Sequence, residues 1–181
     1  MNPYHYPRSE LGLNLRVENT NPEWSRYSVE FSTAYPKPSE ESRIARREYL
    51  RPLGANNVPL VIILHGLGDH SAIPCKLLAG TLVNRGMACF ILYSVFHSSR
   101  MPETVRRRMP ALTSEEWFEG YRMAVIEVCQ VLDWACNRPE INHEQIAVMG
   151  ISLGGFISAI AMGIDERLMA GVFIAMGGTL K

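Results

Sequence analysis

The sequence has no net charge, no long apolar run and few cysteines. Its 18 basic and 18 acidic residues cancel. The chain therefore has no overall field that would attract nucleic acid or an anionic membrane, and neither is expected as a partner. No apolar stretch reaches the roughly 18 residues that cross a bilayer, so no membrane span is predicted. Residues 1–10 lack the charged start and apolar run of a secretory signal.

The four cysteines are scattered and form no Cys-x-x-Cys pair. This pattern indicates neither a metal site nor a disulfide framework, and buried, reduced thiols are expected instead. Reduced thiols fit a reducing compartment, so a cytoplasmic location is predicted. Repeats, low-complexity tracts and Gly/Ser linkers are also missing, which leaves a single domain of ordinary globular composition.

The first part of the chain has little regular pattern. Residues 1–24 contain Pro3, Pro7 and Pro22 without apolar periodicity, so this segment is predicted to be irregular. Apolar and polar side chains alternate over residues 26–35, which predicts a half-exposed strand.

Residues 25–181 are assigned to one domain in which strands and helices alternate. Nearly continuous apolar runs predict buried strands over residues 58–64, 87–93 and 145–149, and a further apolar strand over residues 171–175. Helices are predicted over residues 73–85, from a Thr113–Glu116 capping box to before Pro139, and over residues 153–163. A polar strand is expected over residues 43–50 and a loop over residues 94–112. The alternation predicts right-handed βαβ units, and so an α/β fold with a mostly parallel sheet flanked by helices.

A Gly-x-Ser-x-Gly pattern centred on Ser152 stands between a predicted strand and a predicted helix. A serine that attacks substrate must stand clear of the backbone on a sharp, strained turn. Its neighbours two positions away, Gly150 and Gly154, must therefore lack a Cβ. Gly155 lets the helix pack closely on the sheet. The pattern predicts that Ser152 is a nucleophile and that the Leu153 N–H, at the helix N-terminus, donates to an oxyanion.

A second glycine-rich segment follows the first predicted buried strand and reads HGLGD over residues 65–69. The Gly-x-Ser-x-Gly turn over residues 150–154 is called the elbow below. Together with this elbow, the segment resembles the α/β-hydrolase family, and in particular the HGxGEHS loop of monoglyceride-lipase-like esterases. Asp69 stands where that loop has Glu. The resemblance implies that Gly66 presents the backbone N–H of Leu67 as the other oxyanion donor. It also implies that no cofactor is needed.

Residues 141–146, which lead into the elbow, resemble dienelactone-hydrolase and prolyl-oligopeptidase relatives. They differ in having Asn142 for Asp and Gln145 for Arg. The resemblance extends from about residue 26 to the C-terminus. It implies hydrolysis of a small-molecule carboxylic ester, or another acyl compound, through an acyl-enzyme. A serine peptidase of the prolyl-oligopeptidase-like group is an alternative.

In this family the acid and the base follow the nucleophile, in the order Ser, Asp or Glu, His. No histidine follows His143 and no acidic residue follows Glu166. The triad acid and base are therefore expected to be absent from this chain, which would leave the fold incomplete and the chain nearly inactive. His97 is an upstream alternative for the base, against the simpler interpretation of a solvent-facing loop histidine.

An apolar strand at residues 171–175 with no further strand beside it is expected to promote self-association. Two other interpretations remain open. One is a non-catalytic relative kept as a binding module. The other is a metal-dependent hydrolase, suggested by the spacing of His65, Asp69 and His70. Leu67 stands where that motif needs a histidine, so no metal is expected.

Overall fold

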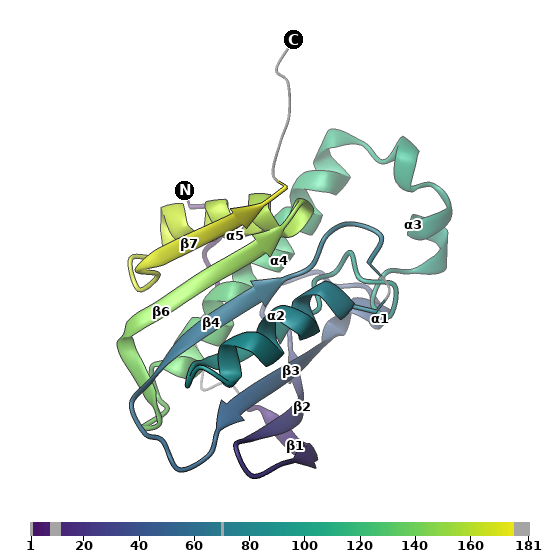
Figure 1. Ribbon diagram of the computed structural model, residues 1–181. Helices are drawn as coiled ribbons and strands as arrows, with labels where there is room; N and C mark the ends of the chain where they lie inside the picture. Colours follow the sequence, from purple (N-terminus) through teal and green to yellow (C-terminus); the bar gives the residue numbers. More distant parts are fainter. Residues whose placement is uncertain (1, 8–11, 70, 176–181) are drawn as a thin grey trace.

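The computed structural model describes residues 2–7, 12–69 and 71–175, which form one sheet with helices on both faces (Figure 1). The strands are β1 (Asn14–Thr20), β2 (Trp24–Ser32), β3 (Ile44–Pro52), β4 (Val58–Leu64), β5 (Ala88–Leu92), β6 (Ile141–Ile151) and β7 (Ala170–Ile174). The helices are α1 (Glu40–Arg43), α2 (Ile73–Val83), α3 (Glu103–Arg107), α4 (Ser114–Ala135) and α5 (Leu153–Ile164), with a 3₁₀ turn η1 (Met109–Ala111).

The sheet has the strand order β1-β2-β3-β5-β4-β6-β7. The strands β5, β4, β6 and β7 run parallel to one another. Their connections carry helices, as a parallel crossover requires. The strands β1, β2 and β3 are antiparallel and extend the sheet beyond β5. The α/β architecture predicted from the alternating second half of the chain is confirmed.

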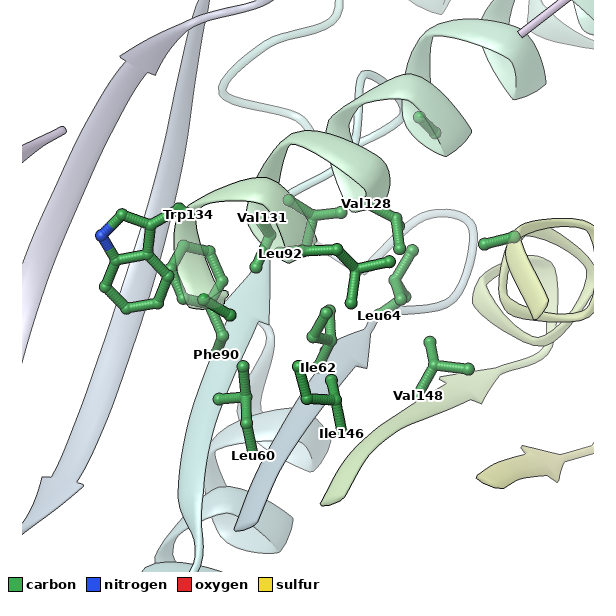
Figure 2. Packing of buried hydrophobic residues seen from close by; sticks show 14 of the residues in the cluster. Leu60, Ile62, Leu64, Phe90, Leu92, Val128, Val131, Trp134, Ile146 and Val148 are labelled. Atoms are coloured by element: carbon green, nitrogen blue, oxygen red, sulfur yellow. The ribbon is translucent and has the colours of Figure 1, made fainter. Parts of the chain in front are cut away.

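Alternate side chains of each central strand face opposite helical layers. Leu60, Ile62 and Leu64 of β4 join the cluster that contains α4 and α5. Figure 2 shows the corresponding side chains of β4, β5 and β6 gathered beneath α4. Val61 and Ile63 point the other way and pack with α2. Because both faces are covered, β4 is apolar throughout rather than alternating.

Two segments differ from the prediction. The segment predicted to be irregular, residues 1–24, contains β1, which pairs antiparallel with β2. The side chains of β1 are mostly exposed. Its pairing therefore depends on backbone hydrogen bonds, which leave no apolar pattern in the sequence. The predicted loop at residues 94–112 contains α3 and η1, which are five and three residues long and bury no side chain.

The strand predicted as polar over residues 43–50 is β3, and it lies within the sheet between β2 and β5. It buries Ala45, Arg47 and Tyr49. Its polar composition is therefore misleading about its position. Arg47 is buried because it is paired with a carboxylate from α4, and Tyr49 packs edge-on against the ring of Trp134.

The long helix α4 begins as predicted. Thr113 Oγ1 accepts a hydrogen bond from the Glu116 N–H at 3.2 Å, and the Glu116 carboxylate accepts one from the Thr113 N–H at 2.8 Å. This is a complete capping box. No helix in the described ranges is both long and apolar enough to cross a membrane.

The expectation of buried thiols is confirmed for Cys75, Cys89 and Cys129, whereas Cys136 is partly exposed. Burial raises the pKa of Cys75 and of Cys89 to about 12. Both thiols therefore stay protonated at neutral pH and behave as apolar packing groups.

Candidate active site

The site lies where the strand order reverses. β5 lies on one side of β4 and β6 on the other. The carboxyl ends of β4 and β6 therefore flank a switch point, which is where ligands bind in open α/β sheets. Leu64 and Gly150 are direct partners in the parallel ladder. The register thus brings the loop after β4 and the turn after β6 to the same edge of the sheet.

The turn after β6 is strained at Ser152. This residue has φ 50° and ψ −114°, a conformation that residues with a Cβ rarely adopt. Its N–H donates to the carbonyl of Ile174 at 2.8 Å, and its carbonyl accepts from the N–H of Gly155 at 2.9 Å. The residue is exposed. Hydrogen bonds from its N–H and to its carbonyl hold the strained backbone of this exposed residue.

The elbow glycines are required by direct backbone contact. A Cβ on Gly150 would lie 2.1 Å from the carbonyl oxygen of Gly154 and 2.5 Å from the nitrogen of Gly155. A Cβ on Gly154 would lie 2.5 Å from the carbonyl oxygen of Leu64 and 2.7 Å from that of His65. Both contacts are with backbone, so neither can relax by turning a side chain. The two glycines let α5 approach the end of β4.

The loop after β4 reaches Ser152 through Gly66. A Cβ built on Gly66 would lie 3.6 Å from the Cβ of Ser152. The next residue, Leu67, is exposed, and Gly68 follows with φ +74°. The Asp69 N–H contacts the Gly66 carbonyl at 3.4 Å and closes the turn. The structure therefore brings Gly66 and Ser152 together, with Leu67 at the next position of the exposed turn.

His65 is a buried connector between two loops. The Ser94 N–H donates to Nε2 of His65 at 3.1 Å. Nε2 is therefore the acceptor, and the ring proton is on Nδ1. Nδ1–H then donates to the Gly66 carbonyl at 2.8 Å. Because a trans peptide points its C=O and N–H in opposite directions, this bond turns the Leu67 N–H away from the His65 ring.

Burial lowers the pKa of His65 below its usual range. The Gly66 carbonyl and Asp69 act in the opposite direction, and Arg47 and Arg100 add to the lowering. The ring is therefore neutral at physiological pH, as its acceptor role at Nε2 requires. Ser94 was not identified from the sequence. Its position directly after β5, at the edge where the site forms, is the signal that could have found it.

The oxyanion donor predicted on the helix side lies at the start of α5. Leu153 is the first residue of this helix, and its side chain is buried. The N–H groups of a first helical turn have no acceptor within the helix, and they carry the positive end of its dipole. The Leu153 N–H follows Ser152 directly. Its role as an oxyanion donor stays a prediction.

His97 is not the solvent-facing loop residue of the simpler interpretation. It is buried, and its ring stacks on Tyr93 with centroids 4.5 Å apart. It also meets the His65 ring edge-on at 5.2 Å. Its Nδ1 accepts a hydrogen bond from the Ser99 N–H at 3.2 Å. These contacts make His97 part of the packing beneath the loop after β4.

The residues that suggested a metal site make other contacts in the structure. His65 uses both ring nitrogens in the bonds to Ser94 and Gly66. The Asp69 carboxylate accepts from the Ala72 N–H at 2.8 Å, ahead of α2. His70 lies outside the described residues. Within the described ranges, no three His, Cys, Asp or Glu side chains gather closely enough to hold a metal ion.

A cavity of about 300 Å³ lies among α1, α3 and the first turns of α4. Its wall includes Phe96 and Met101, which follow β5, together with Glu115 and Glu119 of α4. The residues of the elbow and of the loop after β4 do not line it. It is therefore a separate feature from the surroundings of Ser152.

The chain matches a family model described as alpha/beta hydrolase domain containing 18, over residues 25–177. No curated protein matches it. An acetyl xylan esterase from Paenibacillus sp. R4 has a TM-score of 0.67 at 21% identity, over 90% of this chain and 53% of that one. A cold-adapted esterase from an Arctic intertidal metagenomic library gives 0.70 at 18%, over 92% and 66%.

A glucuronoyl esterase from Teredinibacter turnerae T7901 gives a TM-score of 0.65 at 15% identity, over 94% of this chain and 46% of that one. At such identities the likeness to solved structures concerns the fold. The chain spans between about half and two thirds of the length of these three structures.

Proposed function

Since the chain belongs to the alpha/beta hydrolase domain containing 18 family, we propose that Ser152 is the nucleophile of an ester hydrolase. The observation that carries the proposal is the strained backbone of Ser152, with φ 50° and ψ −114°, at the end of a parallel strand. Such strain costs free energy and persists only where the surrounding structure enforces it, and strained residues cluster at functional sites. Gly150 and Gly154 supply the close backbone contacts that this turn requires.

In the proposed reaction, Ser152 Oγ attacks the carbonyl carbon of an ester while its proton passes to a base. The carbonyl π electrons move to oxygen, and the N–H groups of Leu67 and Leu153 stabilise this oxyanion. The tetrahedral intermediate collapses, the C–O bond to the alcohol breaks, and the alcohol leaves with a proton. Water then hydrolyses the acyl-Ser152 by the same route. No step needs a metal or an organic cofactor.

The histidine base and its carboxylate partner are proposed to lie outside residues 2–175. His143 is exposed on β6, and His97 is packed against Tyr93 and His65. Without a base, a serine hydroxyl is a weak nucleophile. Loss of the base costs about six orders of magnitude in the best-studied serine hydrolase triad. The 181-residue chain alone is therefore expected to turn over substrate very slowly.

A small carboxylic ester is the proposed substrate class. The three structural neighbours named above are esterases. This favours an ester over a peptide, although the identities are low. Because the chain carries no net charge, it is not expected to select substrates by their charge through a long-range field.

Hydrolysis of p-nitrophenyl acetate by the 181-residue chain, with and without added imidazole, tests the proposal. Imidazole supplies the absent base in solution, so it should accelerate ester cleavage by the chain. The same addition to Ser152→Ala should give only the reaction that imidazole catalyses in buffer. Equal acceleration in both proteins would mean that Ser152 is not the nucleophile.

A further inference from the structure

Three charged side chains are completely buried beside the candidate site. Arg47 of β3, Arg100 after β5 and Glu127 of α4 each have 0% of their side chain exposed. Arg100 binds Glu127 through two nitrogens, with Nη1–Oε2 2.8 Å and Nη2–Oε1 2.7 Å. Arg47 Nη2 reaches Oε2 of the same carboxylate at 2.8 Å. This buried charged cluster of Arg47, Arg100 and Glu127 therefore carries two positive charges and one negative charge.

The two guanidinium groups of the buried charged cluster bind the same backbone carbonyl. Arg100 Nη1 donates to the Tyr93 carbonyl at 2.7 Å, and Arg47 Nη1 donates to it at 3.0 Å. Arg100 Nη2 also donates to the Ser42 carbonyl at 2.7 Å, which fixes the guanidinium in place. Burial lowers the pKa of Arg47 to about 9, so it remains protonated at neutral pH.

The carbonyl that both arginines bind belongs to the peptide between Tyr93 and Ser94. The N–H on the opposite side of that peptide is the one that donates to Nε2 of His65. The His65 Nδ1–H in turn donates to the Gly66 carbonyl, whose peptide carries the Leu67 N–H on its far side. Every donor in this series points the same way, from the arginines toward Leu67.

We propose that Arg47 and Arg100 are positioning residues that orient and polarise the oxyanion donor Leu67 through the Tyr93–Ser94 peptide and His65. This inference rests on the proposed function, since it assigns the oriented N–H to an oxyanion. Hydrogen bonds that run in one direction polarise one another. A cation at the start of the series therefore strengthens the last donor, and two bonds at Tyr93 restrict how the peptide turns.

A gain in stability does not by itself explain the buried charged cluster. Burying charges costs solvation free energy, and well-packed apolar residues often replace buried ion pairs with no loss of stability. Apolar replacements would, however, leave the Tyr93 carbonyl without its two donors. Glu127 holds both guanidinium groups at that carbonyl, and its pKa is kept below the usual range by Arg100 and Arg47 despite burial.

Nuclear magnetic resonance of the ¹⁵N-labelled 181-residue chain tests this inference without requiring turnover. The ring nitrogens of His65 report the Nδ1–H tautomer, and the amides of Ser94 and Leu67 report the two peptides. In Arg100→Met, the Ser94 amide should exchange with solvent roughly tenfold faster, relative to core amides such as Ile62, because a charge-assisted bond has been lost. The Leu67 amide resonance should move, and Arg100→Lys should restore part of both changes.

Leu132→Ala is the matched control. Leu132 is a fully buried residue of the same helix as Glu127. Its truncation therefore destabilises the chain without removing any hydrogen bond of the series from the arginines to Leu67. It should leave the His65 tautomer and the relative exchange of Ser94 unchanged. If Arg100→Met does not fold, the apolar triple variant Arg47→Met, Arg100→Met, Glu127→Leu takes its place.

Unchanged signals of His65, Ser94 and Leu67 in the arginine variant would overturn the inference. Changes of equal size in Leu132→Ala would overturn it as well, because they would then reflect general loosening. Failure of the Ser152→Ala comparison would remove the proposed reaction without moving these signals. The two failures are therefore distinguishable.

Discussion

Gly154 lies directly against the carbonyl of Leu64, so that a Cβ on Gly154 would stand 2.5 Å from that oxygen. The contact joins the first turn of α5 to the last residue of β4. It therefore sets how closely the turn that carries Ser152 approaches the loop that carries Leu67. This packing is a property of two backbones, and a side chain at this position would force them apart.

Gly154→Ala should destabilise the chain by about 3 kcal/mol or more, because the added methyl meets two backbone carbonyls. The matched control is Gly163→Ala in the same helix, where a Cβ meets nothing within 4 Å. That change should be neutral or stabilising by roughly 0.5–1 kcal/mol, as alanine favours a helix. Thermal unfolding of the two variants measures the difference. Equal melting temperatures would contradict the close packing described for the elbow.

Ser152→Gly should be more stable than Ser152→Ala by about 1 kcal/mol. Alanine keeps the Cβ that opposes φ 50°, whereas glycine adopts this conformation freely, and part of the gain is offset by the greater freedom of the unfolded chain. Urea unfolding of the two variants gives the comparison. A Ser152→Ala variant as stable as the glycine variant would mean that the turn stores no strain.

The stability of the chain should fall as the pH drops below about 6.5. Burial lowers the pKa of His65 in the folded chain, with Arg47 and Arg100 adding to the effect and Asp69 opposing it. The unfolded state then binds a proton that the native ring does not. The free energy of unfolding therefore decreases as the pH falls toward the native pKa. Protonation would also remove the acceptor at Nε2.

Urea unfolding between about pH 7 and pH 5 measures this dependence. His65→Asn should flatten the decrease, because the titrating group has been removed. His143→Gln replaces an exposed histidine and should leave the slope as it is in the parent chain. A slope that His65→Asn does not change would show that the loss of stability has another source.

Strand β7 lies at the sheet edge and exposes Val172 by 46% and Phe173 by 39%. An apolar edge strand pairs readily with another chain, so the isolated chain is expected to self-associate. Val172→Lys should reduce this association, as sedimentation at increasing concentration would show. Val17→Lys adds the same charge to β1 at the other edge and is the control. Monodisperse behaviour of the parent chain would contradict the expectation.

Features that follow from local constraints were predictable from the sequence. Strand β4 is buried on both faces, so its sequence is continuously apolar. The capping box at Thr113 needs only two residues three positions apart. The elbow turn at Ser152 cannot form without Gly150 and Gly154, so the sequence records it directly. For the same reason, the fold class and the meeting of the two glycine-rich loops could be inferred.

Features that depend on distant partners could not be predicted in this way. Arg47 looks like a solvated residue of a polar strand until Glu127, 80 positions away, is seen to bind it. His97 looks like a loop histidine until the ring of Tyr93 covers it. Strand β1 pairs through its backbone and leaves no apolar pattern. In each case the deciding contact has no fixed spacing in the sequence.

Fluorophosphonate labelling, followed by identification of the modified peptide, is the decisive test of Ser152 as the nucleophile. The comparison is between the 181-residue chain, its Ser152→Ala variant and any longer product of the same reading frame. We expect an adduct on Ser152 that forms slowly in the 181-residue chain, rapidly where the base and its partner are present, and not at all in Ser152→Ala. An adduct that persists in Ser152→Ala would contradict the assignment of the nucleophile. Rapid labelling of the 181-residue chain alone would contradict the placement of the base outside it.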